Sequence, residues 1–109
     1  MIKTKIFNKN WLIEFINGND PRLGLPEKDI VYAGLCVGSI RRIYIANDMI
    51  SDKIKETLIH ELTHAYMRET LQDFDIKKSE EFICDFIGLF GEEIVNKADK
   101  ILAQRKGLN

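Results

Sequence analysis

The residues His60-Glu61-Leu62-Thr63-His64 form a His-Glu-x-x-His motif and include both histidines of the 109-residue chain. In a helix, residues four positions apart lie on one face, one turn apart. Two imidazoles placed in this way can bind one Zn²⁺ ion, and the glutamate between them can act on a water molecule bound to that ion. The motif therefore predicts His60 and His64 as zinc ligands and Glu61 as a general base. The competing interpretation is a helix whose histidines merely lie at the border of the core.

A catalytic zinc site usually has three protein ligands, so a third ligand is expected elsewhere in the chain. Glu81 and Asp85 lie four residues apart in an apolar segment with helical periodicity that begins near Ser79, and they therefore share one helix face. On this basis we expect Glu81 to be the third ligand and Asp85 to hold one ligand imidazole through its other nitrogen. Glu80 and Cys84 remain alternative ligands, because carboxylate and thiolate both bind zinc.

The segments around these residues predict an α+β fold. Apolar residues at helical spacing predict a helix over 51–70 that carries the motif, and a second helix from about 79 to 105 that packs on it. Apolar and β-branched residues predict strands at 30–37 and 40–46, joined as a hairpin before the motif helix. Residues 8–17 are expected to form a short first helix, because Trp11, Leu12, Phe15 and Ile16 fall on one side of it.

Gly88 and Gly91 lie inside the second predicted helix. Each glycine costs about 1 kcal/mol relative to alanine in a helix interior. Their presence indicates a kink in this helix or a close approach of this helix to the motif helix.

Length and composition predict a single domain over residues 1–109. The net charge of −1 offers no general attraction to nucleic acid or to an anionic membrane surface. No apolar run approaches the length needed to cross a bilayer, so no membrane partner is expected. Cys36 and Cys84, without a secretory signal, favour reduced thiols and a cytoplasmic location.

The pair of motifs, His60-Glu61-x-x-His64 followed by Glu81-x-x-x-Asp85, resembles the gluzincin metallopeptidases over roughly residues 30–95. Among small members of that clan the chain is most similar to the ImmA/IrrE group and the minigluzincins, through the segments 43–46 and 55–59. The resemblance implies a minimal zincin-like fold, a Zn²⁺ cofactor, His60, His64 and Glu81 as metal ligands, Glu61 as general base, and Asp85 as the acid that orients a histidine.

The function expected from the motif and the resemblance is a zinc-dependent metallopeptidase that hydrolyses peptide bonds through a zinc-bound water. Its partner would be a peptide or protein substrate, with a regulator protein as one candidate, and the oligomeric state stays open. The alternative is a zinc-binding regulatory or protein-interaction module with little or latent proteolytic activity. A third interpretation is a closed structural zinc site with Cys84 as fourth ligand.

Peptide hydrolysis also needs a hydrogen-bond donor for the oxyanion that develops on the carbonyl. The chain has no third histidine for this role. The candidate donors are Tyr32, Tyr44, Tyr66 and Arg68.

Overall fold

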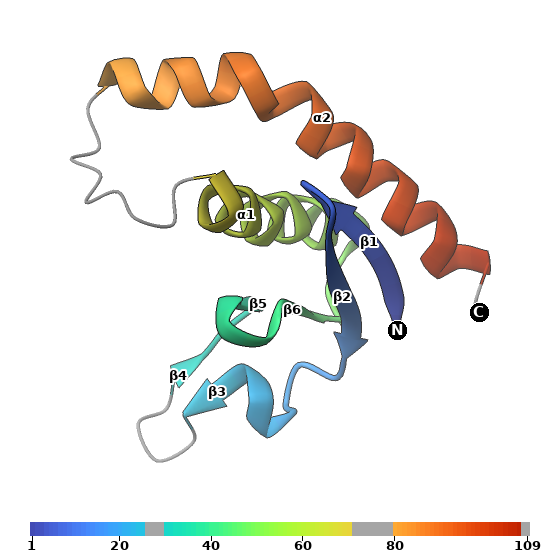
Figure 1. Cartoon of the computed structure of the whole chain (residues 1–109). Coiled ribbons are helices and arrows are strands. Elements are labelled where there is room, and N and C mark those ends of the chain that lie inside the picture. Colours follow the sequence, from blue (N-terminus) through green and yellow to red (C-terminus); the bar gives the residue numbers. More distant parts are fainter. Residues whose placement is uncertain (26–29, 71–79, 108–109) are drawn as a thin grey trace.

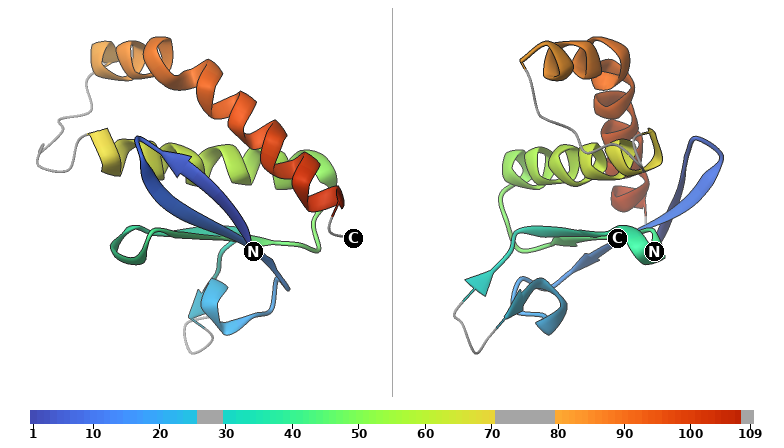
Figure 2. Two further views of the ribbon diagram at one scale, coloured as in Figure 1. Left: turned by 45° about the vertical axis from the view of Figure 1, so that its right-hand side comes forward. Right: turned by 60° about the vertical axis from the view of Figure 1, so that its left-hand side comes forward.

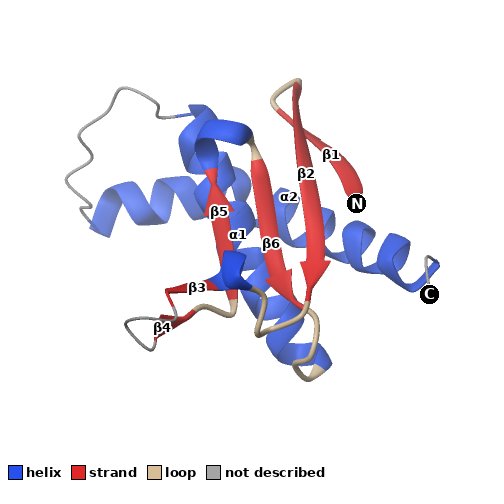
Figure 3. Ribbon diagram, turned by 90° about the horizontal axis from the view of Figure 1, so that it is seen from below, coloured by secondary structure: helices blue, strands red, loops and turns tan. Residues whose placement is uncertain are grey.

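The chain folds into a four-stranded sheet with two long helices on one side of it, so the α+β prediction is confirmed (Figures 1 and 3). The computed structural model describes residues 1–25, 30–70 and 80–107. The strands lie in the order β1-β2-β6-β5, with β2 parallel to β6 and the other pairs antiparallel. The strands of this sheet are β1 (Ile2–Ile6), β2 (Lys9–Ile16), β5 (Gly34–Val37) and β6 (Arg42–Ala46), and the helices are α1 (Ser51–Thr70) and α2 (Glu80–Gly107).

The prediction of a short first helix at 8–17 is wrong, because this segment is the strand β2, paired with β1. The β1–β2 turn is formed by Phe7 and Asn8, whose φ angles of 49° and 65° suit a tight two-residue hairpin turn. Trp11 and Ile13, two residues apart on one face of the strand, point toward the core, and both are fully buried. The same apolar residues fit a helical and an alternating pattern, and pairing with β1 selects the alternating one.

The predicted hairpin before the motif helix is present as β5 and β6, which are antiparallel. The strand expected over 30–37 is divided, however. Its first two residues form β4 (Ile30–Val31), which pairs with β3 (Gly24–Leu25) in a separate small sheet. A short 3-10 helix, η1 (Pro21–Leu23), precedes β3, and a second one, η3 (Gly38–Ile40), connects β5 to β6. The hairpin therefore presents a short strand, β5, at one edge of the main sheet.

The helix predicted over 51–70 is confirmed as α1, which lies between the sheet and α2 (Figures 1 and 2). Its buried side chains pack on Ile43 and Ile45 of β6 and on the C-terminal half of α2. Helix α1 is therefore held by packing on both sides, against the sheet and against α2. The opposite face of the sheet has a smaller apolar cluster that includes Leu23 and Tyr44.

Helix α2 runs unbroken from Glu80 to Gly107, but only its C-terminal half is well buried. Ile94, Ala98 and Ile101 are at most 2% exposed. In the N-terminal segment of α2, defined here as residues 80–91, Phe86 is buried, while Ile83, Ile87 and Leu89 are 50%, 55% and 74% exposed. The preceding residue, Ser79, lies outside the described part of the chain.

The predicted close approach at the α2 glycines is wrong. A Cβ atom built on Gly88 would have no neighbour within 4 Å, and one on Gly91 would meet only Ile87 of the same helix. The ribbon of α2 does change direction between its orange beginning and its red end (Figures 1 and 2), as a kink would require. Within the described residues, neither helix is long and apolar enough to cross a membrane.

Candidate metal centre

His60, Glu61 and His64 lie together in the middle of α1, as the motif predicts. One ligand atom from each residue can be chosen so that all three atoms lie within 4.8 Å of one another. The two imidazole rings have their centroids 5.0 Å apart and both side chains are exposed, whereas Glu61 is only 5% exposed. The helix thus presents two accessible nitrogen donors beside a buried carboxylate.

The turn that carries the motif is fixed by a fully buried stripe on its other side. Leu58, Leu62 and Ala65 of α1 all have an exposed fraction of 0%. Burial of a leucine side chain of this kind stabilises the fold by about 1.5–3 kcal/mol. The positions of His60 and His64 therefore follow from the packing of the helix and do not depend on contacts of their own.

A buried carboxylate anchors the C-terminal end of α1 to the sheet. The Glu69 side chain is 2% exposed and accepts hydrogen bonds from Trp11 Nε1 at 3.1 Å and from Arg41 Nε at 2.7 Å. Charge-assisted bonds of this kind are worth roughly twice a neutral one. The anchor joins α1 to β2 and to the residue before β6.

The burial of Glu61 depends on a glycine in the facing strand. A Cβ atom on Gly34 of β5 would lie 2.7 Å from Thr57 Cγ2 and 3.0 Å from Glu61 Cγ. Only a residue without a side chain lets the strand approach the helix this closely. Gly34 therefore sets the distance between β5 and the motif.

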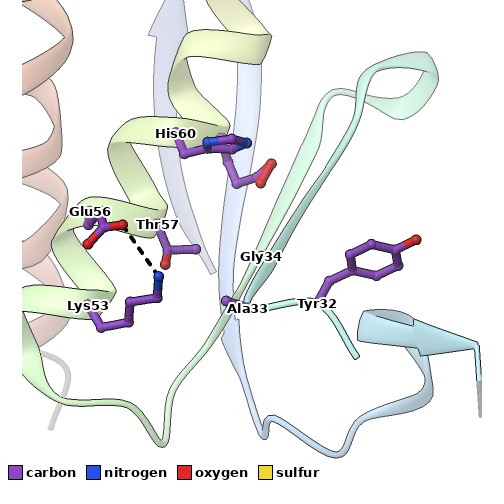
Figure 4. Close-up of a pocket in the computed structure, with 8 residues that line it drawn as sticks. Tyr32, Ala33, Gly34, Lys53, Glu56, Thr57 and His60 are labelled. Atoms are coloured by element: carbon purple, nitrogen blue, oxygen red, sulfur yellow. Dashed lines mark hydrogen bonds and ion pairs between the residues drawn. The ribbon is translucent and has the colours of Figure 1, made fainter. Parts of the chain in front are cut away.

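A cleft runs between β5 and α1 and passes Glu61. One hollow, of about 280 Å³, is lined by His60 and Glu61 and on the other wall by Tyr32 and Gly34 (Figure 4). A second hollow, of about 270 Å³, is lined by Glu61, His64 and Arg68 of α1 and by Leu35, Cys36 and Gly38. Glu61 therefore borders both hollows.

The cleft changes the acid–base properties of two groups. Burial raises the pKa of Glu61, while the nearby His64 and His60 oppose the rise. Burial, reinforced by the charge of Glu61, raises the pKa of the Cys36 thiol to about 11, and the charge of Arg68 acts in the other direction. Glu61 is therefore a better proton acceptor than an exposed glutamate once it is ionised.

The structure does not bring the residues predicted on the second helix to the histidines. Glu81 and Asp85 are exposed on the first turns of α2, as are the alternatives Glu80 and Cys84. Among the described residues, the only group suited to a metal is His60, Glu61 and His64. The roles of Glu81 and Asp85 stay predictions.

Two of the four candidate oxyanion donors point away from the cleft. Tyr66 is 1% exposed and its hydroxyl is hydrogen-bonded to Glu93. Tyr44 lies on the sheet face opposite α1, with the guanidinium of Arg22 5.1 Å from its ring centroid. Arg68 and Tyr32 remain beside the cleft.

Tyr32 forms part of one wall of the first hollow. The residue is 42% exposed, and its ring extends away from Lys53 and Thr57 in the close-up (Figure 4). Lys53 is occupied by an ion pair with Glu56, with Nζ 3.4 Å from the carboxylate oxygen. The first hollow therefore has an aromatic side chain on one wall and an ion pair on the other.

Sequence reasoning missed the residues that form the β5 side of the cleft, Gly34, Cys36 and Gly38. The available signal was the glycine that interrupts the apolar run 30–37, since an isolated glycine in a strand often marks a close backbone approach. The prediction of one strand over 30–37 does not take this glycine into account.

No model of a protein family, no curated protein and no solved structure matches this chain.

Proposed function

We propose that the chain is a zinc-dependent metallopeptidase of the gluzincin type, with His60 and His64 as zinc ligands and Glu61 as general base. The observation that carries the proposal is the cluster of two imidazoles and one carboxylate with ligand atoms within 4.8 Å. Imidazole nitrogen is a ligand that zinc commonly takes, and both imidazoles are exposed toward an open cleft. The two histidines therefore fit the metal, and the Glu61 carboxylate lies close enough to act on a water bound to it.

Glu81 is the proposed third ligand, and Asp85 the acid that orients an imidazole. Both are exposed at the start of α2 and outside the cluster. The proposal therefore requires the N-terminal segment of α2 to approach the motif when zinc binds. The exposed side chains of Ile83 and Ile87 support it, because such an approach can bury apolar surface that is now in water.

Glu61 is the group that handles protons in this proposal. A bound zinc ion supplies a Lewis acid that lowers the pKa of a coordinated water toward neutrality. Glu61, which borders both hollows, accepts the proton from the attacking water and passes it to the leaving amine. Its raised pKa suits both steps, because a carboxylate that binds a proton more firmly is a stronger base.

The edge of the sheet supports a peptide as substrate. In the described sheet, β5 pairs with β6 on one side only. An extended peptide can add to such an edge through main-chain hydrogen bonds. Its backbone would then run along the cleft past Glu61, with residues on either side of the cleaved bond in the two hollows.

The main test uses Glu61→Gln on a mixture of unfolded peptides with added zinc. The variant should bind zinc as the parent does and should cleave at least about 100-fold more slowly, because general base catalysis contributes about 10²–10⁴-fold. Glu92→Gln on the exposed face of α2 is the matched control and should cleave at the parental rate. Parental cleavage by Glu61→Gln would show that the assigned base is wrong.

A second test concerns the third ligand. Glu81→Gln should weaken zinc binding at least about 100-fold, since the loss of a direct ligand exceeds the usual 10-fold to 100-fold effect of residues that only support a ligand. Glu80→Gln tests the alternative carboxylate ligand with the same loss of charge, and it should keep the parental affinity. Parental zinc affinity of Glu81→Gln, measured by competition with a chelating dye, would remove Glu81 from the site.

The alternative is a zinc-binding regulatory module with little proteolytic activity. It is favoured by the exposure of Glu81 and Asp85, because a site with two histidines and one acid can bind a metal without being fully assembled for catalysis. This alternative predicts no cleavage of any peptide in the mixture, with zinc still bound. A zinc-dependent complex with a folded partner protein would then be the activity to seek.

A further inference from the structure

Arg68 places a guanidinium at the end of the cleft beyond His64. It follows His64 by four residues on α1 and lines the second hollow together with Glu61 and His64. Four residues of helix correspond to a rise of about 6 Å along the axis. The backbone positions of His64 and Arg68 therefore lie about one helical turn apart.

The side chain of Arg68 lies across the β5–β6 connection. A Cβ atom on Gly38 would lie 2.5 Å from Arg68 Cδ, 2.8 Å from Nη1 and 2.9 Å from Nε. A residue with a side chain at position 38 would displace the arginine. Gly38 thus leaves the space that Arg68 occupies beside the hollow.

Arg68 has no carboxylate partner among the described residues. The adjacent Glu69 is buried and is bonded to Arg41 and to Trp11. Glu61 lines the same hollow but forms no ion pair with Arg68 in the described part of the chain. The second hollow therefore carries a positioned guanidinium whose preferred counter-ion, a carboxylate, is not supplied by these elements.

We propose that Arg68 determines specificity by binding a carboxylate of the substrate about two residues from the cleaved bond. The spacing follows from the rise of about 6 Å between His64 and Arg68, compared with about 3.3 Å per residue of an extended peptide. Guanidinium groups bind carboxylates through two parallel hydrogen bonds, which gives both strength and orientation. The proposal rests on the proposed peptidase function, and the carboxylate belongs either to an acidic side chain or to the C-terminus of the peptide.

The experiment measures binding and does not depend on cleavage. Three hydroxamates, which chelate zinc, are compared on the zinc-loaded protein by calorimetry: hydroxamate-Gly-Glu-amide, hydroxamate-Gly-Gln with a free C-terminus, and hydroxamate-Gly-Gln-amide. They carry a side-chain carboxylate, a terminal carboxylate and no carboxylate, respectively. At least one of the two acidic probes should bind about tenfold more tightly than the neutral probe, as expected for a hydrogen-bonded charge pair. The tighter acidic probe identifies the source of the carboxylate.

Arg68→Gln should abolish the preference without changing the affinity for the neutral probe. The matched control is Arg42→Gln, which removes the same charge from the opposite face of the sheet, where residues 42, 44 and 46 share a side. The control should keep the preference. Equal binding of all three probes to the parent, or a preference that survives in Arg68→Gln, would overturn the proposal while leaving the zinc site intact. Failure of every probe to bind would instead count against the proposed function and its metal centre, and the inference would fall with them.

Discussion

The motif turns of α1 and the N-terminal segment of α2 carry the two parts of the proposed zinc site, and the fold holds them very differently. Around the motif, Leu58 and Leu62 are fully buried, and a buried carboxylate, Glu69, ties the end of the helix to the sheet. In residues 80–91, by contrast, Ile87 and Leu89 are more than half exposed. Two histidines and a buried carboxylate are thus preassembled by the core. The expected third ligand is on a segment that packs on the core through Phe82, Phe86 and Phe90 and leaves its other face in water.

This difference separates a site built by the fold from one that a metal would complete. Residues whose backbone is fixed by a core need no ligand to reach their positions. A carboxylate on a segment that packs through only one side reaches a metal only if those contacts shift, here the contacts of Phe82, Phe86 and Phe90. Matched substitutions in the two regions should therefore differ in their effect on the stability of the fold.

Leu62→Ala and Leu89→Ala make the same chemical change in the two regions. Leu62 is 0% exposed, so its truncation should lower the free energy of unfolding by about 3–5 kcal/mol. Leu89 is 74% exposed, and its truncation should change that energy by less than about 0.5 kcal/mol. Urea unfolding followed by circular dichroism measures both. A loss of more than about 1.5 kcal/mol for Leu89→Ala would contradict the exposed position of this side chain.

Gly34→Ala and Gly88→Ala form a second matched pair. The new methyl group on β5 would meet Thr57 Cγ2 at 2.7 Å, and the overpacking should cost about 1–3 kcal/mol. On α2 the new methyl group meets nothing within 4 Å and replaces a poor helix former, so stability should rise by up to about 1 kcal/mol. Thermal unfolding distinguishes the two signs. Equal effects would contradict the close approach of β5 to α1.

Glu61→Gln tests the burial of the base through the pH dependence of stability in metal-free protein. Because burial raises the pKa of Glu61 in the folded state, ionisation of this group opposes folding. The stabilising contribution of the protonated group is present below the ordinary pKa of 4.5 and is lost as pH rises through the folded value. The parent should therefore lose stability relative to Glu61→Gln as pH increases from about 4 to 8. A difference that does not vary with pH would contradict the burial.

The reactivities of the two cysteines compare the cleft with the N-terminal segment of α2 without any substitution. Cys36 lies in the cleft, and its pKa of about 11 leaves about one thiol in a thousand ionised at pH 8, three units lower. Cys84 is exposed on the first turns of α2. Iodoacetamide should therefore label Cys84 well before Cys36 in native protein, as mass spectrometry of digests can measure. In urea both should react, and preferential labelling of Cys36 in native protein would contradict its position.

The sequence predicts well the elements whose patterns have one solution. The apolar stripe of 51–70 is long enough to be helical only, and α1 has those bounds. The run 11–16 is short and satisfies both periodicities, so the helix predicted for it was wrong, and the deciding contact is a pairing with β1. Local patterns do not contain such a pairing.

The site was predictable in its motif but not in its walls. The spacing of His60 and His64 is a property of any helix, so their proximity follows from the sequence. The approach of Gly34 and Gly38 to α1 is set by the packing of a sheet edge on a helix, which brings together residues more than twenty positions apart. The orientation of Tyr44 likewise depends on which face of the sheet α1 covers.

The most direct test of the metal centre is a zinc titration of the parent and of His64→Ala, with binding measured by competition with a chelating dye. The chain contains only two histidines, both in the motif, so histidine-dependent binding can arise only here. We expect one zinc ion per chain in the parent, with affinity reduced at least about 100-fold in the variant because a direct ligand is lost. Less than half an equivalent of zinc in the parent, or unchanged binding in His64→Ala, would contradict the metal centre.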